Sequence, residues 1–250
     1  MGKRKGEGDN NQIPVIISLG GSLIAPVAGL NVNFIREFKK LILQEIEKGR
    51  RFVIITGGGQ LSRNYVKALN QITPSDEEEQ DWLGIHATRM NAHFIKAVFK
   101  KYAHPRINKN PRTKENLQKH FAQGEKIMVA AGWRPGWSTD YVATILAERF
   151  KAKKLINLSN VEYIFDRDPK KHPQAQKIEE ISWTDFRKIV GNKWSPGLNS
   201  PFDPIAARLA EKNDLEVAII AGKNLSSLSR YLNNQPFTGS LIKGSTNNKA

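Results

Sequence analysis

Residues 51–63, RFVIITGGGQLSR, decide the fold that this sequence predicts. An apolar, β-branched run stops at three consecutive glycines and gives way to a polar, helix-like pattern. The run 13–19 (IPVIISL), followed by Gly20, Gly21 and Ser22, has the same form. Glycine inside a regular element costs roughly 0.5–1 kcal/mol against alanine, so such clusters serve an unusual turn or a close approach. Two joints of this kind predict phosphate-binding loops, where backbone N–H groups and a helix N-terminus face an anion.

Short apolar runs alternate with helical patterns along the rest of the chain. One helical pattern covers 33–48, and Gly49 follows it where a C-terminal cap is expected. Another begins near Asp76, where three glutamates supply negative charge to the positive end of a helix. Strands are expected at 13–19, 51–56, 126–131, 154–158 and 215–221. The alternation predicts a doubly wound α/β fold, in which a mainly parallel, open sheet has helices on both faces.

The composition limits where the protein acts and which chemistry it uses. At 250 residues and 39% hydrophobic, the chain can form one large α/β domain or two small ones. No run of 18 apolar residues occurs, and residues 1–12 lack the apolar segment of a secretory signal, so they are expected to be a disordered basic tail. The absence of cysteine excludes disulfides and cysteine nucleophiles. We therefore expect a cytoplasmic protein without a membrane partner.

The net charge of +15 raises the question of nucleic-acid binding. About half of the excess lies in residues 96–126, which hold nine Lys or Arg against Glu115 and Glu125. No RNP, zinc-finger or basic-zipper pattern accompanies this segment. We expect a solvated basic surface that favours anionic nucleotides, rather than specific nucleic-acid recognition.

Four polar loops follow the predicted strands and are expected to meet at one edge of the sheet, where such folds bind ligands. They are 20–22, 57–59, 132–140 (GWRPGWSTD) and 159–169 (SNVEYIFDRDP). The common fingerprints G-x-x-x-x-G-K-[ST] and G-x-G-x-x-G do not occur, which argues against a P-loop or Rossmann dinucleotide enzyme. The five histidines show no metal-ligand spacing.

Each candidate residue in these loops has a structural alternative. The glycines at 57–59 are also typical of a tight turn, but Arg63, one helical turn later, can bring a fixed charge to a phosphate there. Asp140 can cap a helix or can orient a cation or a metal-bound water beside a phosphate. Phe165 and Asp168 suit a nucleoside, through stacking and hydrogen bonds to ribose or base, and equally suit a buried aromatic with a turn residue.

With these loops in order, the chain resembles the amino-acid kinase family, most closely the UMP kinases of the archaeal type. The segments that carry the resemblance are LGGSL, TGGGQLSR, DWLGIHATRMNA, GWRPGWSTD and NLSNVEYIFDRDP. The resemblance covers 13–242 and implies a single domain with the family's fold, leaving 243–250 as a flexible tail. It implies that the N-terminal part binds UMP and that the C-terminal part binds ATP.

The resemblance also implies a reaction and its participants. The γ-phosphate of ATP would pass to UMP, giving ADP and UDP for pyrimidine biosynthesis, with Mg²⁺ entering through the ATP phosphates. A homo-oligomer, specifically a hexamer, is implied as well. Asp140 matches the family's catalytic organiser, and the catalytic cations would be Arg63 and Arg134. ATP would contact Gly20, Gly21, Gly59, Arg63, Ser159, Asn160, Phe165 and Asp168. UMP would contact Gly58, Asp81, Gly132, Trp133, Arg134, Pro135, Gly136, Trp137 and Ser138.

The sequence departs from the family at three places. Ser18 stands where many amino-acid kinases have a lysine, which the archaeal UMP kinases also lack, so the charge must come from elsewhere, with Mg²⁺, Arg63 and Arg134 as the candidates. Residues 162–165 read Glu-Tyr-Ile-Phe instead of Asp-Gly-Val-Tyr, and Trp133, Arg134 and Trp137 are bulkier than usual. Two alternatives remain: a kinase of the same family acting on an acyl or isoprenoid phosphate, and a non-catalytic nucleotide or anion binder.

Overall fold

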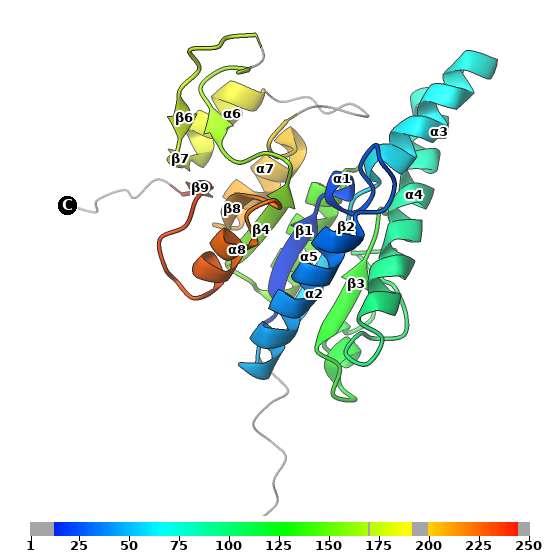
Figure 1. Cartoon of the computed structure of the whole chain (residues 1–250), viewed down its shortest axis with the longest axis vertical. Coiled ribbons are helices and arrows are strands. Elements are labelled where there is room, and N and C mark those ends of the chain that lie inside the picture. Colours follow the sequence, from blue (N-terminus) through cyan, green and yellow to red (C-terminus); the bar gives the residue numbers. More distant parts are fainter. Residues whose placement is uncertain (1–12, 170, 192–199, 245–250) are drawn as a thin grey trace, which may run out of the picture.

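The computed structural model describes residues 13–169, 171–191 and 200–244. Its main sheet has seven strands in the order β3-β2-β1-β4-β8-β9-β7 (Figure 1). Along that order the strands are Ile127–Ala130, Phe52–Thr56, Val15–Leu19, Lys154–Ser159, Glu216–Ala221, Ser240–Lys243 and Glu180–Ser182. A separate two-stranded sheet pairs β5 (Ile164–Phe165) with β6 (Lys177–Ile178).

The fold class predicted from the sequence is confirmed. All five expected strands form, each with ends within two residues of the predicted ones, and β3, β2, β1, β4 and β8 are parallel to one another. The strands β9 and β7 were not predicted, and β9 runs antiparallel to β8 while β7 is parallel to β9. The sheet is therefore mainly parallel, with one antiparallel pairing near its edge.

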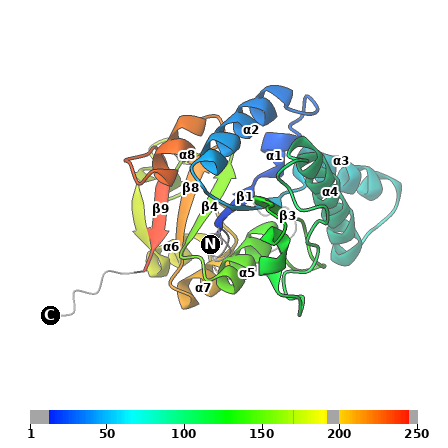
Figure 2. The same cartoon turned by 90° about the horizontal axis from the view of Figure 1, so that it is seen from below.

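Helices cover both faces of this sheet (Figure 2). The helices are α1 (Gly21–Ile24), α2 (Val32–Glu47), α3 (Gly59–Ile72), α4 (Glu77–Val98), α5 (Thr139–Phe150), α6 (Trp183–Val190), α7 (Pro204–Lys212) and α8 (Leu225–Leu232), with one 3₁₀ helix at Leu117–Phe121. Both helices expected at 33–48 and from Asp76 are present, as α2 and α4. A capping box begins α4, because Asp76 accepts from the N–H of Glu79 while the Glu79 carboxylate accepts from that of Asp76.

Two hydrophobic cores fill the spaces between sheet and helices. Alternate strand residues point to opposite faces, so Ile16 joins the core under α5, α6 and α7, while Ile17 joins the core under α2, α4 and α8. Every residue of β2 is buried, as expected for a central strand covered on both sides. This packing fixes the carboxyl ends of the strands, from which the candidate site is built.

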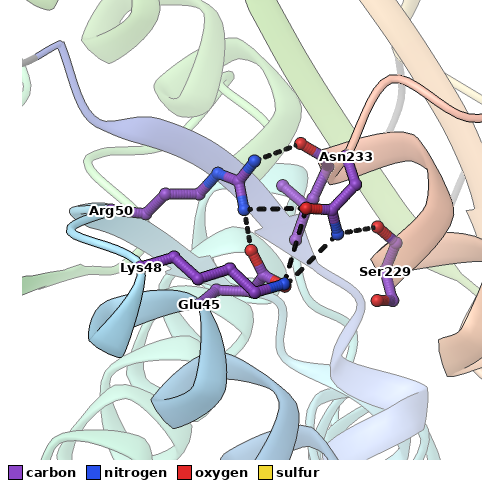
Figure 3. Close-up of polar contacts among 6 residues, drawn as sticks. Glu45, Lys48, Arg50, Ser229 and Asn233 are labelled. Carbon is purple, nitrogen blue, oxygen red and sulfur yellow. Dashed lines mark hydrogen bonds and ion pairs between the residues drawn. The ribbon is translucent and has the colours of Figure 1, made fainter.

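A buried ion-pair network ties α2 to α8 near the amino ends of the strands (Figure 3). Glu45, whose side chain is only 2% exposed, pairs with Lys48 at 2.7 Å and with Arg50. Asn233, just after α8, accepts a hydrogen bond from Arg50 at 3.5 Å and donates to the carbonyl of Ser229 at 2.7 Å. The network lies at the end of the sheet opposite to the glycine loops.

The chain ends need one correction. Lys243 was assigned to the C-terminal tail, but it is the last residue of β9 and pairs with Glu180 at 2.8 Å. The predicted tail at 1–12 and most of that at 243–250 lie outside the described residues. Within the described ranges, none of the helices has both the length and the apolar composition needed to cross a membrane.

Candidate active site

The strand order places a switch point at β1, which has β2 on one side and β4 on the other. The loops that follow these strands meet at the carboxyl edge of the sheet, as the sequence predicted. Gly20 donates its N–H to the carbonyl of Leu158 at 2.8 Å, and Gly57 donates to that of Leu19 at 2.9 Å. Gly222, after β8, donates to the carbonyl of Ser159 at 2.7 Å. The segments that follow β1, β2 and β8, which are distant in sequence, thus lie side by side at this edge.

The two glycine loops pack directly against each other. A Cβ on Gly21 would lie 2.1 Å from the backbone nitrogen of Gly59 and 2.5 Å from the carbonyl oxygen of Gly57. Gly59 also has a φ of +65°, which side chains disfavour. The contact between the two loops therefore requires residues without side chains at Gly21 and Gly59. In α3, which begins at Gly59, the N–H of Gln60 donates to the carbonyl of Ala25 at 3.0 Å, whereas the other N–H groups of the first turn have no partner within their own helix and suit an anion.

Arg63 lies at the junction of these loops. It is exposed on α3, and its Nη2 donates to Ser22 Oγ at 3.1 Å, while its Nε donates to Gln60 Oε1 at 2.9 Å. Ser22 belongs to the loop that follows β1, so the guanidinium bridges both glycine loops. A fixed positive charge thus lies at the two predicted phosphate-binding loops.

Asp140 is not the cap of its helix. Ser138 Oγ accepts the N–H of Tyr141 at 3.1 Å and caps α5, whereas the Asp140 carboxylate turns toward the sheet. Its Oδ1 accepts from Ser18 Oγ at 2.9 Å and from Asn157 Nδ2 at 3.2 Å. Its Oδ2 accepts the N–H of Asp203 at 3.3 Å. Three uncharged donors, from β1, β4 and the start of α7, hold this carboxylate.

The surroundings of Asp140 disfavour its charge. Burial, and secondarily repulsion from Asp203, raise the pKa of the Asp140 carboxyl to about 7, although the hydrogen bonds from Ser18 and from the Asp203 backbone oppose this. Ser18 occupies the position at which the sequence lacks the expected lysine. The residue at that position therefore contacts the predicted organiser, but it brings no positive charge.

Sequence reasoning missed Asn157 and Asp203. Asn157 is a buried amide flanked in β4 by the apolar residues Ile156 and Leu158, which was a signal for a polar function at that point. Asp203 accepts the N–H of Ala206 at 2.9 Å and caps α7, which starts at Pro204. The Asp-Pro pair indicated this helix start, but nothing in the local pattern indicated a neighbour at Asp140.

Helix α4 holds the loop at 132–138 in place. Asp81 Oδ2 accepts the N–H of Gly136 at 2.7 Å, and Thr88 Oγ1 accepts that of Gly132 at 2.8 Å. Asn91 Nδ2 donates to the carbonyl of Gly57 at 2.7 Å, so the same helix also contacts the second glycine loop. Burial raises the pKa of Asp81, although the Gly136 N–H opposes the shift. Asp81 thus joins α4 to the predicted acceptor loop.

The loop at 132–138 carries a stack of aromatic rings. Trp137 stacks on Tyr141 with centroids 4.1 Å apart, and Trp133 lies 6.1 Å from Trp137. The guanidinium carbon of Arg134 lies 4.3 Å from the Trp133 ring centroid and 5.8 Å from that of Trp137. Arg134 is exposed, and among the described residues no hydrogen bond or ion pair joins it to Asp140. Its cation is therefore held on the indole rings.

The predicted ATP nucleoside residues divide into two places. Asn160 lines a cavity of about 710 Å³ together with Ser22 and Lys223, and Lys223 pairs with Glu162 at 3.5 Å. Ser159 Oγ accepts the N–H of Val161 beside it. Phe165, in β5, and Asp168, in the turn after it, are not among the residues lining that cavity. The described residues contain no cluster of three or more His, Asp or Glu side chains able to hold a metal.

Comparisons with known proteins identify chains similar to this one in sequence and in fold. The uridylate kinase of Methanocorpusculum labreanum is 30% identical over 232 residues, covering 92% of this chain and 96% of that protein. The uridylate kinase of Methanoregula boonei is 34% identical over 219 residues, covering 87% and 90%. The crystal structure of uridylate kinase from Archaeoglobus fulgidus, 28% identical, matches with a TM-score of 0.73 and covers 92% of this chain and 99% of its own. Residues 14–221 match the model of the amino acid kinase family, to which the chain therefore belongs.

Proposed function

We propose that the protein is a UMP kinase, which transfers the γ-phosphate of ATP to UMP and releases ADP and UDP. The observation that carries the proposal is the similarity to uridylate kinases over 92% of the chain. The strand order also brings the glycine loops and the other segments that carry the resemblance to the same edge of the sheet. Gly20, Gly21, Gly59 and Arg63 would receive ATP, while Gly58, in the second glycine loop, would face UMP. The loop at 132–138, with Asp81, would receive UMP.

The arrangement suits phosphoryl transfer, which needs in-line positioning and neutralisation of charge rather than a covalent nucleophile. The N–H groups that begin α3 and the Arg63 guanidinium would face the ATP phosphates. Asp81, already fixed by the Gly136 N–H, has oxygen lone pairs left for ribose hydroxyls. Asp140 would organise the groups between the two substrates.

The residues around Asp140 fit a bound Mg²⁺ that arrives with ATP. Burial, and secondarily repulsion from the Asp203 carboxylate, raise the pKa of Asp140, and a nearby cation would offset both effects by favouring the charged carboxylate. When bound, Mg²⁺ would neutralise charge on the transferring phosphate. The ATP phosphates would hold the ion, and the Asp140 carboxylate would orient it.

The absence of a lysine at position 18 favours one alternative function, that of a nucleotide-binding protein without catalytic activity. Because Ser18 and Asn157 give Asp140 only neutral partners, a nucleotide-binding protein without turnover would use the same contacts. A family member acting on an acyl or isoprenoid phosphate would keep the glycine loops but would have no ribose for Asp81 to hold. Turnover with UMP separates the proposed kinase from both.

The family resemblance extends the proposal beyond the site. We propose one domain over 13–242, with UMP bound by its N-terminal part and ATP by its C-terminal part. We also propose a homo-oligomer, a hexamer, that works in the cytoplasm. Gel filtration with light scattering tests the assembly, since a hexamer has six times the 28.1 kDa chain mass.

The deciding experiment is a coupled ADP-release assay with Mg²⁺-ATP and a panel of acceptors. The panel contains UMP, dUMP, CMP, AMP, an acyl phosphate and an isoprenyl phosphate. UMP should give the highest kcat/KM, and the Asp140→Asn variant serves as the control for contaminating kinases. Turnover of another acceptor in preference to UMP, or binding of UMP without ADP release, would reject the proposal.

A further inference from the structure

Arg89 is a cation of α4 that sequence reasoning did not single out. Its Nη2 donates to the backbone carbonyl of Trp133 at 3.1 Å, and its guanidinium carbon lies 6.0 Å from the ring centroid of Trp82. Its Nε is buried and has no hydrogen-bond partner among the described residues. The guanidinium therefore lies between a tryptophan of its own helix and the loop at 132–138.

The position of the Arg89 guanidinium is energetically unfavourable, which indicates that its contact with the loop has a function. Burial lowers the pKa of Arg89, which means that the surroundings disfavour its charge. The buried Nε adds the penalty of an unmade hydrogen bond. A leucine or methionine would fill the same space without either penalty. Among the described residues, the hydrogen bond of the Arg89 side chain goes to the loop at 132–138, so its function is to be sought there.

The contact with Trp133 controls the direction of a peptide group. In a trans peptide unit the C=O and the N–H point in opposite directions, and the described residues contain no cis peptide. Because Arg89 holds the carbonyl of Trp133, the N–H of Arg134 must face the other way. The adjoining contacts from α4, at Gly132 and Gly136, both hold N–H groups. Arg89 is thus the α4 contact in this set that leaves an N–H of the loop pointing away from the side chain that holds it.

We propose that Arg89 is a positioning residue of the acceptor site, which fixes the loop at 132–138 by its Trp133 carbonyl and so presents the N–H of Arg134 to a phosphate. This inference rests on the proposed function for the identity of the acceptor. Arg89 itself need not touch the substrate. Its cation also strengthens the hydrogen bond to the carbonyl, because charge-assisted bonds are stronger than neutral ones.

The kinetic test compares three variants. Arg89→Met keeps most of the side-chain volume and removes the donors, Arg89→Lys keeps a donor and the charge, and Arg208→Met is the control, because Arg208 is exposed on α7. Loss of a charged hydrogen bond should raise the KM for UMP roughly 10- to 150-fold in Arg89→Met. The KM for ATP should stay within about 2-fold, since only the acceptor loop is released. Arg89→Lys should recover part of the loss, because an ammonium donates to one carbonyl but lacks the planar fork.

A second measurement does not depend on turnover. Hydrogen exchange of the substrate-free protein should be at least about tenfold faster over 132–138 in Arg89→Met, and unchanged in Arg208→Met. If the wild type releases no ADP with UMP, the proposed function fails, and the exchange experiment alone decides the role of Arg89. Unchanged exchange over the loop overturns the inference. So does an equal rise in the KM for ATP and UMP, or faster exchange with an unchanged KM for UMP.

Discussion

Replacing Asp140 by asparagine should make the protein a poorer catalyst and, above neutral pH, a more stable fold. The substitution keeps the shape and keeps an oxygen that accepts from Ser18 and Asn157. It removes the charge that burial and Asp203 disfavour. The same property that makes Asp140 useful beside a phosphate therefore lowers the stability of the unliganded protein.

The size of the effect follows from the pKa. The Asp140 pKa rises from 3.8 to about 7 on folding, and at 1.36 kcal/mol per pKa unit this is roughly 4 kcal/mol. Because the folded pKa lies above the unfolded one, this contribution to stability is complete below pH 4 and is lost as the pH rises through 7. Asparagine does not titrate, but it gives up the bond from the Asp203 N–H, at a cost of about 1 kcal/mol. The variant should be more stable by roughly 3 kcal/mol at pH 8 and within about 1 kcal/mol of the wild type at pH 5.

Thermal unfolding at both pH values, with kcat measured alongside, tests this reasoning. For a chain of this length 1 kcal/mol shifts Tm by about 2–4 °C, so Asp140→Asn should melt roughly 6–12 °C higher than the wild type at pH 8. Its kcat should fall about 10²-fold or more. Asp185→Asn is the control, since Lys188 and Ser182 lower the pKa of that exposed carboxyl, and it should bring no gain at pH 8. Equal Tm values at pH 8 would refute the argument from burial, and an unchanged kcat would remove Asp140 from catalysis.

Three further predictions concern other parts of the molecule. Arg63→Ala should lower kcat/KM for ATP strongly, and Arg63→Lys should restore it only in part, because the guanidinium has several donors that match a phosphate and one that reaches Ser22. Equal activity of the lysine and arginine forms would contradict this. Asp81→Ala should raise the KM for UMP about 10- to 150-fold with little change for ATP, and dUMP should be a poorer substrate than UMP for the wild type; steady-state kinetics that leave the UMP value unchanged would reject the ribose role. Glu45→Gln should lower the free energy of unfolding in urea without changing either KM, because it breaks the ion pair between the buried Glu45 and Arg50 (Figure 3). The loss should be about 3 kcal/mol or less, since the Arg50 side chain is 24% exposed and is not left as a fully buried charge.

The sequence predicted the central part of the fold because that part is the most regular. A strand covered on both faces must be apolar throughout, so runs such as 52–56 are visible without their neighbours. The last two strands of the sheet order, β9 and β7, were missed, since each has only three or four residues and a mixed pattern. Lys243 was assigned to a tail for the same reason. Its place in β9 depends on pairing with β7 and β8, which local sequence does not report.

The candidate site was predictable where its residues lie in loops with unusual composition. The glycines, Asp140 and the tryptophan loop drew attention because plain turns and linkers seldom combine such residues, whereas Asp81, on α4, was indicated only by the family resemblance. Asn157 and Asp203 were missed because their importance comes from contacts with Asp140 across 17 and 63 positions of the chain. Arg89 looked like an ordinary helix arginine. Only the folded chain shows that it reaches the carbonyl of Trp133.

The contact between Gly21 and Gly59 has a consequence for how this protein can change. The backbones of the two loops touch with no side chain between them, so neither loop can shift without pushing the other. Because Gly58, in the second of these loops, is expected to face the acceptor, a variant selected for a new phosphate donor would alter its kinetics toward the acceptor as well. Substitutions in the two loops would show strong non-additivity. Donor and acceptor recognition would then be inherited as one trait, and swapping a single loop from a relative would fail where swapping both would succeed.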